Sequence, residues 1–592
     1  MTTSEVPSFN QLHALLRVLL APTSLRSFRH QSSLFVDALS LMDSEPSPTA
    51  KRPNEDQRGS PDPKRAKTTQ EPDNGEGKSR KGQKQAKGQT SKKMGRRKRE
   101  QFDEKEGGGA KRVDSDEPKA PRLPKRMCAL LIGFCGSGYS GMQIQRNAKT
   151  IENTLFDALV RIGAVSKDNA DDPVKVGLGR AARTDAGVHA AGNVVALKMI
   201  TQIPGVDDLA ARINEELPPE IRLWGHIRVQ NSFNPRTLCD SRKYTYFFPS
   251  YLLIPPKPTS ALYRVLVKHA ASLTPPMDVP FAGNEFWSQI FPVTELENMD
   301  DDRDIPITPN QDEVADMARK RAWRIGSDQM ERLRAGARRY LATHNFHNFT
   351  VNGAFGDRSN QRVMKNIEIA DPVVYGETEW ISVLFHGQSF MMHQIVRRKM
   401  ISALVLTCRT GTPPELIDEL YGPRDVFIPK MPALGLLLEQ PIFDSYNTRV
   451  AKANEKVKED DPDHRPPIKF DRHRPEMEAF KEQWIYKNMR TVEERDGLFD
   501  AWIRMVDAYG GSDLLYLNPR GTIPAAAVIQ LPSLAEGKAK GKERHRKGGF
   551  REKKLFDATS FPVGGVVAEE VDDEEDPDEA ALLTGKREEL DG

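Results

Sequence analysis

Cysteine is scarce in this chain of 592 residues, which has four: Cys128, Cys135, Cys239 and Cys408. No two of them form a C-x-x-C pair, and none has a histidine at the spacing of zinc ligands. The pattern argues against a disulfide framework and against a structural zinc module, so no metal is expected. A reducing compartment is the simplest one for such a protein.

Long apolar runs and a strong net charge are also missing. No stretch approaches the roughly 20 apolar residues that cross a bilayer, which predicts a soluble protein without a membrane partner. The formal net charge is +3, so attraction to nucleic acid has to come from local basic patches. With 38% hydrophobic and 29% charged residues, the chain is too polar to be folded throughout.

Aromatic residues are rare between 43 and 125, where Lys, Arg, Ser, Gly, Pro and Glu dominate. Such a segment buries too little apolar surface to offset chain entropy and is predicted to be disordered. Its basic clusters 51–52 and 64–67, separated by eleven residues, resemble a bipartite nuclear import signal, and 96–99 adds a further cluster. They predict nuclear localisation through an import receptor; a solvated charged linker is the alternative.

The two ends of the chain carry other signals. Residues 1–41 have three arginines and only two acidic residues, which resembles a mitochondrial presequence and predicts a second, mitochondrial location. Met42 is an alternative start. At the other end, 536–554 is rich in Lys and Arg and 568–592 is acidic, which predicts a disordered tail.

Between these ends, strand patterns alternate with amphipathic helix patterns, which predicts an α+β fold. In a first unit, apolar residues at helical spacing follow Thr150, and alternating aromatic residues begin at Tyr244. The expected elements are strands at 127–134, 192–200, 221–229 and 244–248 and helices at 150–162 and 209–217.

A second unit of the same kind follows a stretch rich in Pro, Asp and Asn, 255–327, which is predicted to be an insertion or interlobe linker. Residues 412–415, TPPE, are typical of a capping box that opens a helix. The other expected elements are a helix with Met330, Leu333, Ala337 and Leu341 on one face, strands near 361–370 and 379–386, a long helix after Phe390, and two appended helices marked by Met477, Phe480 and Trp484 and by Leu498, Trp502 and Met505.

These patterns give a domain plan in which two related α+β lobes join their sheets. The predicted parts are a disordered basic region at 1–125, an N-terminal lobe at 126–254, the linker at 255–327, a C-terminal lobe at 328–447, a helical extension at 448–534 and a charged tail at 535–592.

The stretch GLGRAARTDAGVHAAGNVVALK, 177–198, raises a question of function because its first half matches the dinucleotide pattern G-x-G-x-x-G/A. A dinucleotide site needs the glycines to join a strand to a helix, and an acidic residue about 20 positions further on. Here the run passes into the β-branched pair Val194-Val195, and no Asp or Glu occurs from 186 to 206. The sequence therefore argues against a nucleotide-dependent enzyme.

The second half of that stretch places Arg183, Thr184 and Asp185 in a turn that Gly187 and Gly192 make permissive. An Asp in such a loop is commonly an Asx-turn or a cap. Arg183 is close enough in sequence to orient or charge-balance the carboxylate, which favours a functional acid.

Six ordered motifs across roughly 126–447 resemble the TruA-type tRNA pseudouridine synthases, and within them the eukaryotic tRNA pseudouridine synthase 1 branch. They are 136–143 (GSGYSGMQ), 182–190 (ARTDAGVHA), 242–246 (RKYTY), 346–350 (FHNFT), 387–390 (GQSF) and 432–436 (PALGL). The resemblance implies the pseudouridine synthase fold, with a basic cleft between the lobes. The appended helices also resemble that branch.

The resemblance implies a cofactor-free isomerisation of uridine to pseudouridine in tRNA on a flipped-out nucleotide. Asp185 would be the carboxylate beside the sugar; whether it attacks sugar or base, or promotes elimination, stays open. Arg183 would splay the target nucleotide. Tyr244 would stack on the uracil and take the proton from carbon 5, with Tyr246 the better candidate for core.

The same resemblance implies further substrate-binding positions: Thr184, His189, Tyr139, Gln143, Leu436, Lys243 and Phe390. Leu436 would be the apolar floor under the base, and ordinary core packing is an equally good interpretation. Arg180, Arg236 and Lys243 are candidates for phosphate contacts.

This chain departs from the family pattern at the basic residue that pairs with the catalytic Asp. The family has F-x-x-H-Q-I-R-K-M, whereas 390–400 is FMMHQIVRRKM, two residues longer. Two extra residues turn a helix by about 200°. Either Arg397 or Arg398 would take the pairing position, and we favour Arg398.

A non-catalytic RNA-binding or RNA-folding protein on the same scaffold is the rival function. In that case Asp185, Arg183 and Tyr244 would be dispensable. The expected partners are tRNA and, as further substrates, small nuclear RNA or mRNA; the resemblance implies a monomer.

Overall fold

The computed structural model describes residues 123–145, 147–290, 312–350, 353–388, 395–459, 461–529, 550 and 556, without the side chains of 312–314 and 395–397. The predictions for the terminal signals, the start at Met42 and Phe390 lie outside these residues. Of the predicted disordered tail at 535–592, only Phe550 and Phe556 are described, and both are buried, which differs from the prediction at these two positions.

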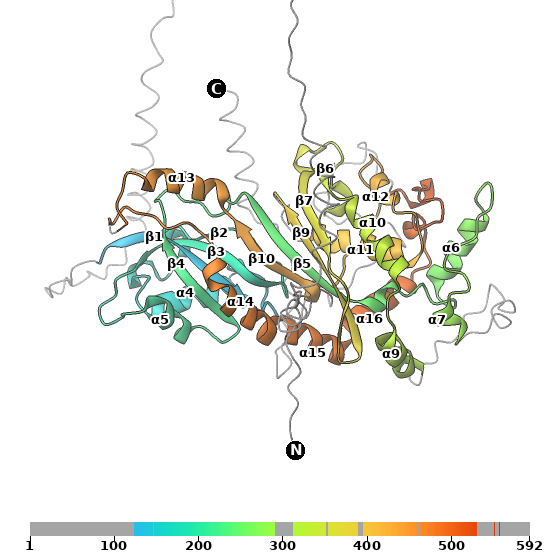
Figure 1. The fold of residues 1–592 in the computed structure, drawn as a ribbon, viewed down its shortest axis with the longest axis horizontal. Coiled ribbons are helices and arrows are strands. Elements are labelled where there is room, and N and C mark those ends of the chain that lie inside the picture. The colour runs from blue at the N-terminus through green and yellow to red at the C-terminus, as the bar shows by residue number, and fades with distance from the viewer. Residues whose placement is uncertain are drawn as a thin grey trace, which may run out of the picture. The chain divides into compact units, whose positions relative to one another are not determined.

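A single mixed sheet of ten strands runs through both halves of the chain (Figure 1). In order across the sheet its strands are β4 (Ile221–Arg228), β1 (Lys125–Phe134), β3 (His189–Ile200), β10 (Leu436–Ile442), β5 (Ser241–Pro249), β9 (Thr378–Gly387), β7 (Gln361–Ile369) and β6 (Ala342–Asn345). Two short strands pair outside this path, β2 (Gly179–Arg180) with β3 and β8 (Val373–Tyr375) with β9. The predicted α+β class is confirmed.

The two halves exchange strands at the centre of the sheet. β10 lies far along the chain, yet it pairs in parallel with β3 and antiparallel with β5. β5 in turn pairs with β9. The centre of the sheet is therefore built from alternating early and late segments, which fixes β3 and β5 one strand apart.

The helices of the first half follow the predicted apolar faces. In α4 (Ile151–Arg161) the N-cap is Thr150, whose hydroxyl accepts from Asn153 N, and Ile151, Leu155 and Leu159 are buried. α5 (Leu209–Glu216) is capped by the carboxylate of Asp208. Both helices are confirmed.

The helices of the second half are confirmed in part. α10 (Ser327–Arg338) buries Met330, Leu333 and Ala337, whereas Leu341 lies beyond its end. The long helix is α11 (Ile395–Arg409).

The prediction of a capping box at 412–415 is wrong. The hydroxyl of Thr412 is hydrogen-bonded to the hydroxyl of Thr410 at 2.8 Å instead of capping a helix. Leu416 N and Ile417 N donate to the carbonyls of Pro413 and Pro414 in tight turns. The helix α12 (Leu416–Glu419) therefore begins later and is short.

The segment predicted as linker contains helices. They are α6 (Ala261–Ala271), α7 (Glu285–Ser288) and α9 (Asp312–Ala322). In α6 the residues Leu262, Leu266 and Ala270 are buried at four-residue spacing. That stripe was present in the sequence, but the surrounding prolines and acids obscured it.

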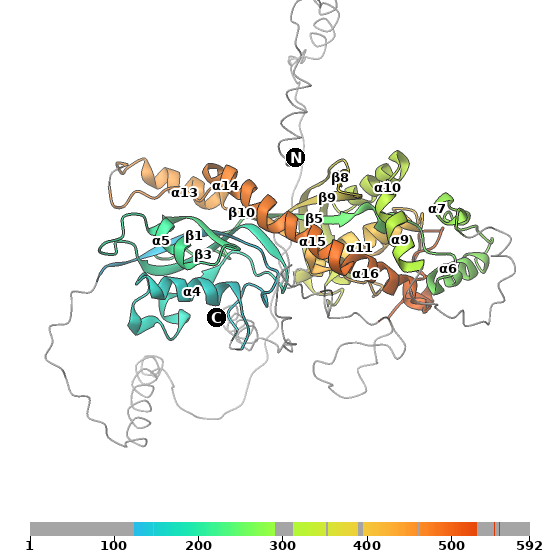
Figure 2. The same cartoon turned by 90° about the horizontal axis from the view of Figure 1, so that it is seen from below.

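A run of C-terminal helices crosses from one half of the sheet to the other (Figure 2). It follows α13 (Asp444–Asn454) and consists of α14 (Arg474–Phe480), a π-helix (Lys481–Tyr486), α15 (Lys487–Asp496) and α16 (Leu498–Asp507). Met477, Phe480, Leu498 and Trp502 are buried as predicted. The wider π turn shifts the buried phase, so that Ile485 rather than Trp484 is fully buried.

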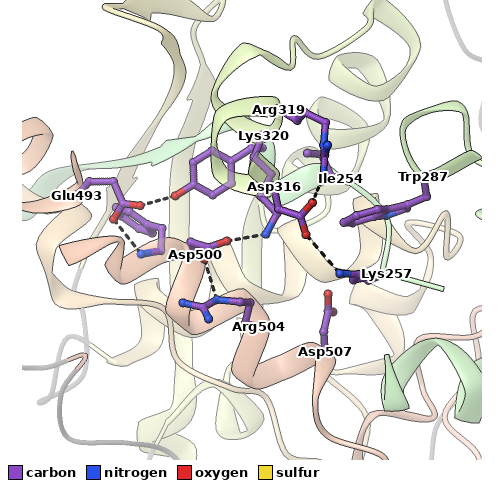
Figure 3. A network of polar contacts seen from close by, with 12 residues as sticks. Ile254, Lys257, Trp287, Asp316, Arg319, Lys320, Glu493, Asp500, Arg504 and Asp507 are labelled. Carbon is purple, nitrogen blue, oxygen red and sulfur yellow. Dashed lines mark hydrogen bonds and ion pairs between the residues drawn. The ribbon is translucent and has the colours of Figure 1, made fainter. Parts of the chain in front are cut away.

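A buried polar network holds the end of α15 and the start of α16 (Figure 3). The Glu493 carboxylate accepts from the Tyr251 hydroxyl and, at 2.9 Å, from Phe499 N. Next to it, Asp500 pairs with Lys320 at 2.6 Å and with Arg504 at 2.7 Å.

Glu493 makes the stability of the protein depend on pH. Burial raises the pKa of its carboxyl to about 7 from 4.5, and Asp500 acts in the same direction. Because the folded pKa is the higher one, the stabilisation is complete below pH 4.5 and is lost as the pH rises through 7. Relative to Glu493→Gln, the wild-type free energy of unfolding should fall by about 3 kcal/mol between pH 4.5 and pH 8. Urea denaturation at both pH values measures this, and parallel pH curves for the two proteins would contradict it.

Candidate active site

The Arg183-Thr184-Asp185 turn joins β2 to β3. Its start is pinned by the amide of Asn193, which accepts from Ala182 N at 3.3 Å and donates to Ala182 O at 2.9 Å. Its end is closed by Val188 N, which donates to Asp185 O at 3.2 Å. The side chains of Asp185 and Arg183 are half-buried, and Thr184 is buried. The carboxylate is thus presented from a backbone held at both ends.

The glycines of the dinucleotide pattern have a different role. Gly177 ends a short 3₁₀ helix (Pro173–Val176) with φ 65°, and Gly179 lies in β2. These glycines therefore join a helical turn to a strand, the reverse of the order that a dinucleotide site requires. The prediction that these glycines do not lead from a strand into a helix is confirmed.

The GSGYSG loop, residues 136–141, packs directly on the Asp185 turn. Met142 N donates to Thr184 O at 3.0 Å, and Gly187 N donates to Tyr139 O at 3.3 Å. The loop also precedes α4, whose first backbone amide donates to Gly141 O. Two motifs that lie more than 40 residues apart therefore form one rigid unit.

Tyr139 anchors this loop. Its side chain is 2% exposed, and its hydroxyl donates to Glu220 at 2.9 Å. The ammonium of Lys149 lies 4.3 Å from the ring centroid. Burial and the neighbouring Glu220 raise the pKa of the phenol well above its usual range. These contacts give Tyr139 a structural role in the loop; its predicted contact with substrate stays a prediction.

His189 connects the same loop to the central strands. Its ring is fully buried, and Nδ1 accepts from Gly136 N at 3.1 Å. Burial lowers the pKa of His189 to about 4, so the ring is neutral at physiological pH. His189 therefore fixes the loop, and a role in substrate binding stays a prediction.

Tyr244 and Leu436 lie on two neighbouring strands at the centre of the sheet. Tyr244 is paired with Leu438 of β10, and Leu436 is paired with Tyr246. Because alternate residues of a strand point to the same face, these side chains share one face of the sheet. Leu438 is also paired with Ala190 of β3, the strand that follows the Asp185 turn. At about 4.8 Å per strand, β3 and β5 are about 10 Å apart.

Both tyrosines of β5 are buried. Tyr246 is fully buried, and its hydroxyl donates to Pro432 O at 2.7 Å, which is a core role as predicted. Tyr244 is 2% exposed. Contact with a base would therefore require a local opening.

Arg398 lies in the interior, with a side chain that is 1% exposed. Its guanidinium donates to the carbonyls of Met431 and Phe556. Burial raises the pKa of the Tyr246 phenol well above its usual range, and the charge of Arg398 opposes this shift without reversing it. α11 runs without a break over the two extra residues. The side chain of the alternative residue, Arg397, is not among those described, so the two arginines cannot be compared. The pairing of Arg398 with Asp185 stays a prediction.

The remaining candidate residues differ in surroundings. Lys243 and Gln143 are half-buried, and Lys243 is paired across strands with His386 and Gln440. Arg180 donates to both carboxylate oxygens of Glu152, at 2.5 and 2.8 Å. This pairing to a fully buried acid gives Arg180 a structural role, and its predicted phosphate contact stays a prediction.

Sequence reasoning missed Asn193, Glu152 and Glu220, which hold the site loops. Asn193 carried a signal, because it is a polar residue within the apolar strand 188–197. The two glutamates gave none, since their partners are distant in sequence. Among the described residues, no three His, Cys, Asp or Glu side chains come together as metal ligands would, and no helix is long and apolar enough to cross a membrane.

Comparison with known proteins defines the class. Residues 337–444 match the family described as tRNA pseudouridine synthase. A protein of Candida glabrata named tRNA pseudouridine synthase 1 is 40% identical over 412 residues, covering 66% of this chain and 72% of its own length. One of Schizosaccharomyces pombe with the same name is 38% identical over 474 residues, covering 67% and 86%. The chain belongs to the tRNA pseudouridine synthase family, so the predicted resemblance is confirmed. A Saccharomyces cerevisiae relative named tRNA pseudouridine(27/28) synthase is 37% identical over 333 residues, which are 54% of this chain and 85% of that protein.

Proposed function

We propose that this protein converts uridine to pseudouridine in tRNA, with Asp185 acting on a flipped-out nucleotide. The names of its relatives support the reaction and the substrate. The position of its turn supports the role of Asp185. The 136–141 loop fixes this turn, which leads into β3, and only β10 separates β3 from β5, the strand of Tyr244.

The reaction balances without a co-reactant. The bond between N1 of uracil and C1′ of ribose breaks, the base turns, and a bond between C5 and C1′ forms. The proton on C5 is lost and N1 ends up protonated, so the product is an isomer of the substrate. A half-buried carboxylate suits this chemistry, because it can attack the sugar or base, or deprotonate the sugar, while the surrounding loops exclude water.

The neighbouring residues have complementary roles in this proposal. Arg183, beside the carboxylate, has the planar multi-donor group that suits a splayed nucleotide. Tyr244 stacks on the base and takes the C5 proton. Leu436, on the same face as Tyr244, is the apolar surface under the ring. Arg398 supplies the positive charge toward Asp185.

Partners and location form a separate part of the proposal. Small nuclear RNA and mRNA would be further substrates, since a site that reads a flipped base and RNA shape does not require a whole tRNA. The basic clusters at 51–52, 64–67 and 96–99 support nuclear import, and residues 1–41 support a mitochondrial form. The protein acts as a monomer.

Incubation of purified protein with tRNAs made by transcription tests the reaction, because such tRNAs contain no pseudouridine. We expect pseudouridine at defined sites, mapped by carbodiimide derivatisation, with no cofactor added. Tight tRNA binding without conversion would support the rival RNA-binding function. A requirement for an added nucleotide would overturn the cofactor-free reaction.

A further inference from the structure

The C-terminal helical run places a buried ammonium behind the centre of the sheet. Lys481, in the π-helix, is 6% exposed. Its Nζ donates to Glu439 Oε2 at 3.0 Å and pairs with Glu478 at 3.2 Å. Burial alone would lower the pKa of Lys481, but Glu439, Tyr486 and Glu478 outweigh it and keep the side chain cationic. A charge so deeply buried requires its carboxylate partner.

The partner of Lys481 occupies a special position in β10. Leu438 is paired with Tyr244 and Gln440 with Lys243, so Glu439 is the extra residue of a β-bulge. A bulge re-aims a side chain and disturbs the local pairing of the strands. The register of β10 on β5 therefore depends on what holds Glu439.

A second donor to Glu439 lies next to Tyr244. The hydroxyl of Thr245 donates to Glu439 Oε1 at 2.7 Å. Because consecutive side chains of a strand point to opposite faces, Thr245 and Tyr244 face opposite sides of the sheet. The contacts from Lys481 through Glu439 to Thr245 therefore hold the backbone of β5 next to Tyr244, from the face of the sheet opposite to the Tyr244 side chain.

The same helical run also contacts the loop beside Asp185. Asn488 Nδ2 donates to the Ser137 hydroxyl at 2.7 Å, and both side chains are buried. The oxygen of the Asn488 amide has no hydrogen-bond partner in the described structure. A buried amide with an unused acceptor costs stability compared with a leucine of similar size. What Asn488 provides and a leucine would not is therefore the hydrogen bond to Ser137 in the 136–141 loop.

We propose that Lys481 and Asn488 are positioning residues, which set the Tyr244 strand and the Asp185-side loop relative to each other for the isomerisation. This inference rests on the proposed function. The two residues are seven positions apart on one helical run, so a single rigid element holds both parts of the site. The C-terminal helices are then part of the catalytic apparatus without touching the substrate.

Single-turnover kinetics with excess protein separates positioning from binding. For Lys481→Met, Thr245→Val and Asn488→Leu we expect the rate of pseudouridine formation to fall about 10-fold to 100-fold, the size of effect that a small misplacement causes. The dissociation constant for tRNA should change less than about threefold, because none of these residues is placed at the RNA. Thr245→Ser keeps the hydroxyl and should restore the rate of Thr245→Val to near the wild-type value.

Lys320→Met is the matched control. Lys320 is also a largely buried lysine paired with a carboxylate, Asp500, but neither residue of this pair belongs to β3, β5 or β10. The Lys320→Met substitution should lower the stability of the protein and leave the rate of pseudouridine formation within about twofold of wild type. Each variant is assayed well below its melting temperature, and the near-isosteric Thr245→Val serves if Lys481→Met fails to fold.

Three results would overturn the inference: unchanged rates in folded Thr245→Val and Lys481→Met, an equal loss of rate in Lys320→Met, or a loss confined to tRNA affinity. Wild type and Asp185→Asn are run in parallel. If wild type forms no pseudouridine, the proposed function fails and the inference with it. If wild type is active and the variants are equally fast, the inference alone fails.

Discussion

Replacing Asp185 with asparagine is expected to lower the rate of pseudouridine formation more than about 1,000-fold, as expected when a group that acts on the reacting atoms is lost. The amide has nearly the same size and keeps the turn, but it carries no charge and is a poor nucleophile and base. Single-turnover assays with chemical mapping of pseudouridine measure the loss.

The affinity of Asp185→Asn for tRNA should stay within about threefold of wild type. Removal of a negative charge beside a polyanion does not weaken binding, and the backbone bonds of the turn do not involve the carboxylate. The matched control is Asp157→Asn, an exposed acid on α4, which should leave both rate and affinity unchanged. Activity that survives in Asp185→Asn would remove Asp185 from the mechanism and favour another acid.

Gly136→Ala is expected to abolish activity and to destabilise the protein by about 3 kcal/mol, the scale of an overpacked interior. A Cβ at this position would lie 2.1 Å from the carbonyl oxygen and 2.6 Å from the carbonyl carbon of Val188. Both atoms belong to backbone, so the Asp185 turn has to move away from the loop. The bond from Gly136 N to His189 would be lost in the same movement.

Urea denaturation and the single-turnover assay measure the two effects of Gly136→Ala. Gly356→Ala is the control, because Gly356 is exposed and a Cβ there meets no atom within 4 Å. That variant should stay within about 0.5 kcal/mol of wild type and keep its rate. A fully active and stable Gly136→Ala would show that the close contact of the two loops is not required.

Local patterns were sufficient for most elements of the fold. The Thr150 cap and the apolar face of 151–162 predicted α4, and alternating residues predicted β4, β5 and β9. The prediction was wrong where a second hydrogen-bond partner was available: the hydroxyl of Thr412 is bonded to the hydroxyl of Thr410 and not to a helix amide. The π turn at 481–486 similarly altered a helical phase that sequence spacing assumes to be constant.

The site was predictable only as separate motifs. Asp185 and Tyr244 could be singled out by their motifs, but no spacing in the sequence places β10 between their strands, because that pairing is non-local. The same limit hid the bonds from Lys481 to Glu439 and from Asn488 to Ser137, which join residues 42 and 351 positions apart. Arg398 shows a further limit, since a two-residue insertion leaves its direction open until the helix is seen.

The position of β10 has a consequence for the folding of the protein during its synthesis on the ribosome. Of the strands in the described part of the chain, the one that separates β3 from β5 is the last to be synthesised, at 436–442. Until it has left the exit tunnel, β3 and β5 each expose an open edge that invites pairing with a foreign strand. The centre of the sheet cannot close before this strand emerges, so nascent chains need protection from aggregation until residue 442 has left the tunnel.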